Sequence, residues 1–145
     1  MSVTLNGQLL GRTHHATRAL LERELTALGL TFAQSLLLTV VAAADAPIPV
    51  DQAVRRLVDG LKTDAASARG VLAELVDAAL VAPAPGDGHL VSVTERGRVV
   101  QSRAAAAGAA IGARLWADLP VDDVAAAARV LETVRHRAEA EVAAR

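Results

Sequence analysis

Apolar residues recur at every third or fourth position along most of the chain, a pattern that predicts mainly helices. A first helix is predicted over residues 5–28, and Gly29 follows it as a C-terminal glycine. Thr31 and Gln34 have the spacing of a capping box, so a second helix is expected from there to about Ala44. Because this second segment is apolar on nearly all sides, we expect it to be a buried central helix.

A helix-turn-helix is predicted in the middle of the chain. Residues 45–49 form an extended break, because each proline in them disfavours helix at the residue before it. A third helix is predicted over about 50–62, and Thr63 or Asp64 can cap a fourth. Two helices joined by so short a turn are typical of a helix-turn-helix. The fourth helix is expected to direct these residues inward: Ala68, Val71, Leu72, Leu75, Val76 and Ala79.

The only strand-like stretch follows these helices. Residues 80–82 and 90–93 flank a segment dense in turn formers, which predicts a two-stranded hairpin with its tip at residues 86–88. Thr94 is expected to cap a long helix that ends near Ala117. Pro120 interrupts, and a last amphipathic helix begins near Val121. Its narrow apolar stripe is close to coiled-coil spacing: Val121, Val124, Ala128, Leu131, Val134, Ala138 and Val142.

The composition indicates a thin core that a second copy of the chain would complete. The 145 residues suffice for one domain, and 52% of them are hydrophobic, so a packed state is expected. Phe32 and Trp116 are the only aromatic residues, and much of the hydrophobic share is alanine. Alanine favours helices but buries little area, so long helices that pack closely on one another are predicted, with part of the core formed between two copies.

Charge and motifs exclude several classes of protein. The net charge of −1 argues against an unspecific polycation, and the absence of cysteine rules out disulfides and thiolate metal sites. No apolar run reaches the about 18 residues that a membrane span needs, and no secretory signal is evident, so a cytoplasmic location is expected. We find no nucleophile motif, phosphate loop or paired carboxylates, and therefore predict no catalytic residues, no cofactor and no enzyme. His14 and His15 are adjacent, so their side chains diverge by about 100° and cannot chelate one metal ion.

Three motifs resemble the MarR (multiple antibiotic resistance regulator) family, and together they cover nearly the whole chain in order. Residues 28–34, LGLTFAQ, resemble the joint between the first two helices of that family. Residues 75–81, LVDAALV, resemble the end of its recognition helix, where the chain turns into the wing. Residues 91–98, VSVTERGR, are similar to its entry into the fifth helix.

This resemblance implies a mainly α protein of about six helices with a small β-hairpin wing, a winged helix-turn-helix. It places the DNA-binding part at residues 31–98 and the dimerisation helices at 1–30 and 99–145. The chain would act as a bacterial transcription regulator, a homodimer that binds a pseudo-palindromic operator in double-stranded DNA. Repression that a small, often aromatic, ligand relieves would be typical of the family, and a two-fold dimer presents two recognition helices about one DNA turn apart.

The resemblance also assigns candidate DNA-binding residues. Arg69 is the first candidate for a base contact, because arginine pairs with guanine more often than any other residue does; an ordinary solvated arginine is the alternative. Gly70 beside it costs about 1 kcal/mol relative to alanine and suggests that something approaches this face closely. The remaining candidates for base, phosphate or minor-groove contacts are Ala66, Ser67, Lys62, Thr63, Arg55, Arg56 and His89, each also explicable as a surface residue.

Two departures from the family weaken the DNA-binding interpretation. The wing, residues 83–89, is short and lacks the arginine that the family places in the minor groove. Residues 50–70 hold four basic side chains against three acidic ones, a net charge of only +1. The alternative function is therefore a dimer of the same fold with a degenerate DNA-binding surface, which acts through a protein partner or sequesters a small molecule.

A ligand site is predicted in the cleft of the dimer. His14 or His15 would face this cleft, with Arg12 as a further neighbour. The other expected lining residues are Arg18, Phe32, Leu36 and Trp116, for which core packing or solvent exposure is the alternative. No metal site and no contact with a membrane are expected.

Overall fold

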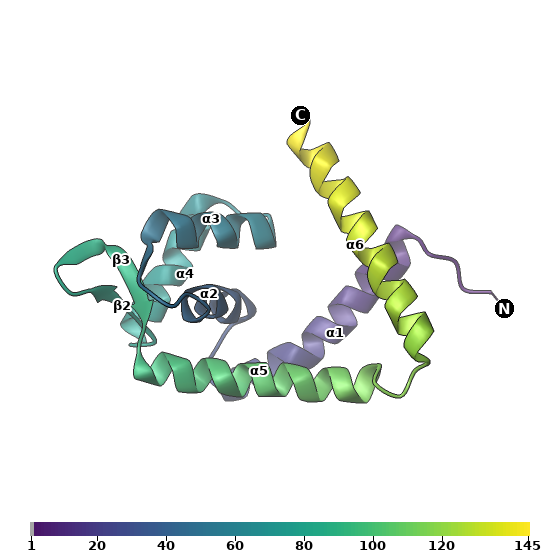
Figure 1. Cartoon of the computed structure of the whole chain (residues 1–145), viewed down its shortest axis with the longest axis horizontal. Coiled ribbons are helices and arrows are strands. Elements are labelled where there is room, and N and C mark those ends of the chain that lie inside the picture. Colours follow the sequence, from purple (N-terminus) through teal and green to yellow (C-terminus); the bar gives the residue numbers. More distant parts are fainter. Residues whose placement is uncertain (1) are drawn as a thin grey trace. The chain divides into compact units, whose positions relative to one another are not determined.

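The computed structural model describes residues 2–145, and within them the chain forms six α-helices and three short strands (Figure 1). Their order is α1 (Gly7–Ala27), α2 (Phe32–Ala42), β1 (Ile48–Pro49), α3 (Val50–Leu61), α4 (Ala65–Asp77), β2 (Val81–Ala84), β3 (Asp87–Val93), α5 (Glu95–Leu115) and α6 (Val121–Ala143). The chain separates into two compact units, Met1–Gly108 and Ala109–Arg145.

The joint between α1 and α2 follows the local rules that the sequence suggests. Gly29 has a φ of +75°, and the backbone N–H groups of Gly29 and Leu30 close the end of α1 in a Schellman motif. Thr31 Oγ1 accepts the Gln34 N–H at 3.1 Å, while Gln34 Oε1 accepts the Thr31 N–H at 3.0 Å, so both halves of the capping box are formed. The start of α1 differs from the prediction by two residues, because the Asn6 side chain caps the helix at Gly7.

Among residues 2–145 no single helix has the length and apolar character of a membrane span. Length and composition would admit α1 and α2 only as a pair, with a bend of 76° between them.

The helix-turn-helix consists of α3 and α4 with a turn of three residues. Lys62 ends α3 in the left-handed conformation, with φ +55°, and the Asp64 side chain caps α4. On α4 the buried positions are Ala68, Leu72 and Leu75, which lie on one face. The prediction that Ala79 points inward is wrong: α4 ends at Asp77, and Ala79 is exposed in a left-handed conformation of φ +59°.

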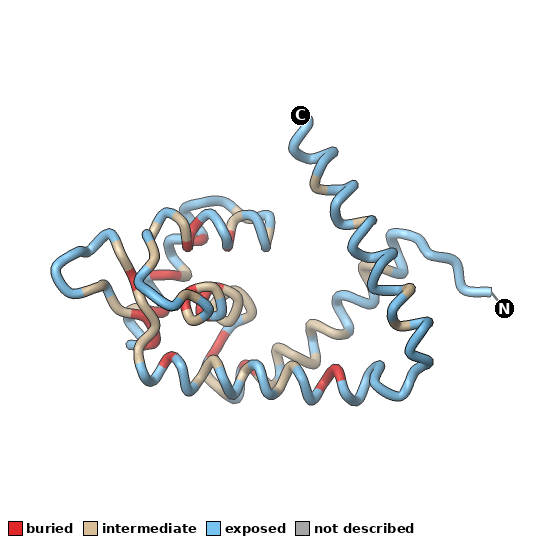
Figure 2. Tube along the Cα trace, in the orientation of Figure 1, coloured by how far each residue is buried: buried red, intermediate tan, exposed pale blue. Residues whose placement is uncertain are grey.

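The core of the first unit lies where α2, α3 and α4 pack on one another and on the sheet, which is where buried positions gather in Figure 2. Leucine and valine fill it, and α2 contributes three buried residues, as do α3 and α4, while most other positions of α2 are half-buried. The largest side chains with almost no exposure are Leu25, Leu37, Leu38, Val41, Leu57, Leu75 and Val81. One face of α4 packs against this core, and its other face is exposed.

The sheet has three strands in the order β1-β3-β2, so the prediction of a two-stranded hairpin missed one. Ile48 pairs with Val91, and Pro49 with Leu90, in an antiparallel arrangement. The predicted tip was also misplaced: the strands reach Ala84 and Asp87, and the turn between them is the dipeptide at 85–86, with Gly86 at φ +79°. Proline followed by a glycine of positive φ is typical of a type II turn.

Gly97 and Thr94 join the wing to α5 by close contacts. Thr94 Oγ1 donates to the Ala79 carbonyl at 2.7 Å and accepts the Gly97 N–H at 2.9 Å, so it caps α5 as predicted and also holds the chain leaving α4. Gly97 is buried, and a Cβ there would lie 2.0 Å from the Leu80 carbonyl oxygen. Only glycine allows the backbone of α5 to approach Leu80 this closely.

The second unit contains the end of α5 and all of α6. None of the α6 residues, all of which are described, is buried, and α6 is exposed along nearly its whole length in Figure 2. The apolar stripe predicted for α6 is present but uncovered within this chain, since Val121 is 81% and Leu131 50% exposed.

Candidate nucleic-acid interface

The N-terminal half of α4 presents an open surface of small side chains. Ala66, Ser67 and Arg69 are exposed, whereas Ala68 between them is buried against the core. Within the part of the chain that the structure describes, no atom beyond the local backbone lies within 4 Å of a Cβ built on Gly70. The approach expected at Gly70 therefore does not come from the chain itself, and this half of α4 is accessible to an external partner.

Arg69 forms an ion pair that sequence spacing did not reveal. Its Nη2 lies 3.1 Å from Oδ1 of Asp51, in the first turn of α3. Both side chains are more than half exposed, at 56% and 74%, so the pair contributes little to stability. It does bring a carboxylate beside the arginine that is the first candidate for base contact, and the separation of 18 positions along the chain hides this from any local pattern.

Ser67 is bound to the cap of its own helix. Its backbone N–H donates to Asp64 Oδ1 at 2.7 Å, and its Oγ donates to Asp64 Oδ2 at 2.8 Å. These two hydrogen bonds, the backbone one first, lower the pKa of the Asp64 carboxyl from its ordinary value. A fully ionised carboxylate thus stands at the start of the exposed half of α4.

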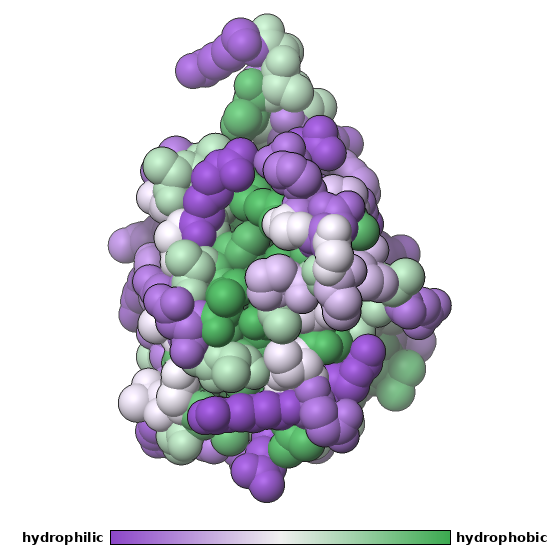
Figure 3. Space-filling model, turned by 90° about the vertical axis from the view of Figure 1, so that its left-hand side faces the viewer, coloured by the Kyte–Doolittle hydropathy of each residue, from purple (hydrophilic) through white to green (hydrophobic). Residues whose placement is uncertain are grey.

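The other candidate DNA contacts lie on α3, on the turn after it and on the hairpin. Arg55 and Arg56 are exposed on α3, Thr63 is half-buried, and Lys62 Nζ donates to the carbonyl of Asp59 at 2.5 Å. His89 is exposed on β3 and belongs to the hairpin. Figure 3 views the end of the molecule that carries the hairpin, where hydrophilic side chains surround a band of hydrophobic ones. With a two-residue turn and no arginine, the hairpin offers no long basic side chain beyond its strands.

Two of the predicted ligand-binding residues lie in contact in the first unit. The Arg18 guanidinium stacks over the Phe32 ring at 4.2 Å from its centroid, and its Nε lies 2.8 Å from Oε1 of Glu22. Leu36 is half-buried and packs against the core beside this helix start. Glu22 was not predicted, although its spacing of four residues from Arg18 was a usable signal.

His14 and His15 lie on α1, outside the contact of Arg18 with Phe32. His14 and His15 are exposed with ring centroids 5.5 Å apart, and Arg12 is exposed as well. Trp116 belongs to the second unit, where its ring lies against Gly112 and half of the residue is exposed. It lines an apolar groove of about 570 Å³ with these residues: Leu119, Asp123, Val124, Ala127, Ala128 and Leu131.

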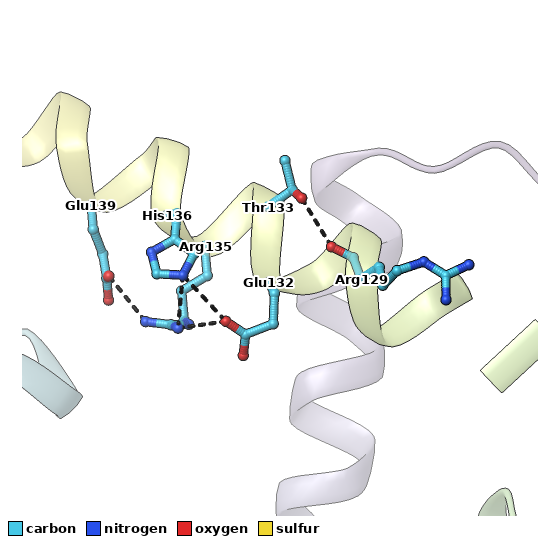
Figure 4. Close-up of polar contacts among 6 residues, drawn as sticks. All are labelled: Arg129, Glu132, Thr133, Arg135, His136 and Glu139. Carbon is cyan, nitrogen blue, oxygen red and sulfur yellow. Dashed lines mark hydrogen bonds and ion pairs between the residues drawn. The ribbon is translucent and has the colours of Figure 1, made fainter. Parts of the chain in front are cut away.

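The polar side chains of α6 pair with one another along the helix. Figure 4 shows Arg135 between Glu132 and Glu139, with its Nη2 and Nη1 at 2.6 Å and 3.1 Å from their carboxylate oxygens. Hydrogen bonding to Glu132, then its charge and that of Glu139, raises the pKa of Arg135. His136 Nε2 lies 3.5 Å from the same Glu132 carboxylate. These contacts connect residues three or four apart, which support an exposed helix.

The comparison with solved structures finds proteins of the same architecture. No family model and no curated protein sequence matches the chain. Among solved structures it is similar in fold to a MarR family transcriptional regulator from Rhodococcus, with TM-score 0.74 and 22% identity over 88% of this chain and 91% of that one.

A MarR family protein of Mycobacterium tuberculosis is similar to the chain in two solved structures. Its complex with DNA has TM-score 0.71 and 26% identity, over 91% of this chain and 98% of that one. Its complex with p-aminosalicylic acid has TM-score 0.69 and 26% identity, over 90% and 98%. Six helices in this order, the three-stranded wing and these likenesses show that the chain has the winged helix-turn-helix fold of MarR family proteins.

Proposed function

We propose that this protein is a homodimeric transcription regulator that inserts α4 into the major groove of a pseudo-palindromic operator. The observation that carries the proposal is the exposed N-terminal half of α4, fixed by the core on one face and open on the other. The M. tuberculosis neighbour was solved with DNA, which supports this use of the fold. A regulator of this kind acts where the DNA is, in the bacterial cytoplasm.

The small residues of α4 suit a close approach to base edges. Ala66 and Gly70 leave the helix backbone free to enter the groove, and Arg69 supplies the donor fork that fits guanine O6 and N7. Arg55, Arg56 and Lys62, with Thr63, would bind phosphates and position the helix. Because the net charge of this region is only +1, we expect modest affinity and a shallow dependence on salt.

Dimerisation is proposed through the N- and C-terminal helices. Within this chain α6 buries no residue, and the groove beside Trp116 is apolar. A long helix with an uncovered apolar stripe is marginal in water without a partner, and a second copy supplies one. Two copies related by a two-fold axis would present two α4 helices about one DNA turn apart.

We propose that a small aromatic acid relieves repression. The support is the contact of Arg18 with Phe32, in which the guanidinium stacks on the aromatic ring and keeps one edge exposed. Such an edge suits a carboxylate attached to a flat ring. The M. tuberculosis neighbour was solved with p-aminosalicylic acid, a ligand of this chemistry. His14, His15, Leu36 and Trp116 stay predicted lining residues of the site in the dimer.

The test is selection from a random duplex pool followed by fluorescence anisotropy at low and moderate salt. We expect a pseudo-palindrome bound by two chains, with affinity reduced on the order of tenfold or more in Arg69→Ala. Arg103→Ala, at an exposed position on α5, is the matched control and should bind as the wild type does. Equal binding by the Arg69→Ala protein would contradict the proposed role of α4.

One observation favours the second candidate function, a degenerate DNA-binding surface that acts through a protein partner or a sequestered ligand. Asp51 and Asp64 place two carboxylates beside Arg69 and Ser67, and the wing has no arginine. Binding to DNA that is blind to sequence and lost at physiological salt would favour this candidate.

A further inference from the structure

We propose that Asp64 and Ser67 form an acceptor-only edge at the start of α4, which selects an amino base, cytosine before adenine, at one strand position of the operator. Guanine and thymine, the keto bases, would be disfavoured at that position. The inference rests on the proposed function, since it requires that α4 enter the major groove. It adds a group of hydrogen-bond acceptors that contacts bases to the hydrogen-bond donors of the Arg69 guanidinium.

Neither of these two side chains has a free hydrogen-bond donor. Ser67 has one hydroxyl hydrogen, and it is given to Asp64 Oδ2 at 2.8 Å. The Ser67 N–H is likewise given to Asp64 Oδ1 at 2.7 Å. The carboxylate is acceptor-only and has about four lone-pair sites, of which these bonds use two. A base that meets these two side chains therefore meets oxygen lone pairs and no side-chain hydrogen.

The edge is placed where base contacts occur. Asp64 and Ser67 are exposed, and the N-terminal residues of a recognition helix are those that reach base edges. Ala65 and Ala66, which lie between them, carry no polar side-chain atom, so no other side chain on this turn competes for the same base. The low pKa of Asp64 keeps the carboxylate charged at neutral pH.

The chemistry of the major groove then decides which base fits. Cytosine presents the N4 amino group and adenine the N6 amino group, both donors, whereas guanine presents O6 and N7 and thymine O4, all acceptors. Aspartate is suited to cytosine N4, and the acceptor N7 next to N6 makes adenine the second choice. A keto base would face a desolvated carboxylate with no hydrogen between them, which is unfavourable.

The experiment repeats the duplex selection with Asp64→Asn and with Asp64→Ser. Asparagine and serine cap a helix about as well as aspartate, so both variants should keep α4, and circular dichroism checks this. Each brings a donor to the edge and removes the charge. In the wild-type pool we expect one position in each half-site where cytosine or adenine is enriched over guanine and thymine on the order of tenfold.

In both variants that preference should fall below about threefold, while the guanine assigned to Arg69 keeps its enrichment. Arg69→Ala is the matched control and should relax a different position. A wild-type pool without an amino-base position, or variants that retain the preference unchanged, would overturn the inference and leave Asp64 as a helix cap only. Failure of the wild type to enrich any sequence would instead overturn the proposed function, and this inference with it.

Discussion

Among all exchanges of glycine for alanine in the described chain, we expect Gly97→Ala to lower the free energy of unfolding the most. The added Cβ would lie 2.0 Å from the Leu80 carbonyl oxygen and 2.8 Å from Val93 Cγ2, and contacts under 3.0 Å essentially never occur at a real Cβ. The first turn of α5 must therefore move away from Leu80 by about 1 Å or more. Leu80 is itself buried, so it has no room to yield in the opposite direction.

The size of the effect follows from what this movement breaks. The Thr94 N–H donates to the Leu80 carbonyl at 3.1 Å, and the Thr94 hydroxyl donates to the Ala79 carbonyl at 2.7 Å. Each lost hydrogen bond costs about 1 kcal/mol, and overpacking costs roughly 1–3 kcal/mol more. The free energy of unfolding of Gly97→Ala should thus fall by about 3–5 kcal/mol.

Urea unfolding followed by circular dichroism at one fixed protein concentration measures this change. Gly60→Ala is the matched control, because Gly60 is exposed in α3 and a Cβ there meets nothing within 4 Å. It should gain about 0.5–1 kcal/mol from helix propensity. A loss of less than about 1 kcal/mol in Gly97→Ala would refute the reasoning from the close contact.

Four further predictions concern single residues. Ala79→Gly should raise the free energy of unfolding by about 0.5–1 kcal/mol in urea titrations, because glycine adopts the left-handed conformation of φ +59° without strain; an unchanged value would argue against strain there. Thr31→Ala should lower it by about 1 kcal/mol, since the capping box of α2 is lost; no loss would mean that water replaces the cap. The pKa of the Asp64 carboxyl is lowered from 3.8 in the folded chain. The ionised carboxylate therefore stabilises the fold fully above pH 3.8, and this stabilisation is lost as the pH falls through the lowered pKa. The Tm difference between wild type and Asp64→Ala, which loses the cap, should stay constant from about pH 7 to 5 and shrink below about pH 4, and a difference that shrinks already near pH 6 would implicate another group. Asp51→Asn should tighten binding to all duplexes in anisotropy titrations, because Arg69 loses its competing carboxylate; weaker binding would mean that Asp51 positions the arginine.

Helix ends were the part of the fold that local chemistry predicted well. Gly29, the pair Thr31 and Gln34, and Thr94 each act within a few residues, so their spacing alone specifies where α1 ends and where α2 and α5 begin. The end of α4 was predicted two residues too far, because no glycine marks it. Ala79 occupies the position that glycine usually takes, and helical spacing continued past it without a signal.

The missed strand shows where local patterns fail. β1 contains only Ile48 and Pro49, and its partners Val91 and Leu90 lie more than 40 residues along the chain. Two residues are too few for an alternating pattern, and proline is rare in strands except at an edge, where β1 lies. Only the packed structure brings these segments together.

One part of the candidate interface was predictable from the sequence and another was not. That Ser67 and Arg69 are exposed follows from the helical phase set by Ala68 and Leu72, and this was predictable. The contact of Arg69 with Asp51 depends on how α3 crosses α4, which no spacing in the sequence encodes. The pair of Arg69 with Asp51 is therefore a result of tertiary structure.

The cap of α4 has a consequence for how the operator could diverge during evolution. Asparagine caps a helix as well as aspartate does, so exchanging one oxygen of Asp64 for an amino group would leave the recognition helix intact. The same exchange would alter which base the edge accepts. Under the proposed function, an exchange at this position would thus change the target sequence with little change in the stability of the fold.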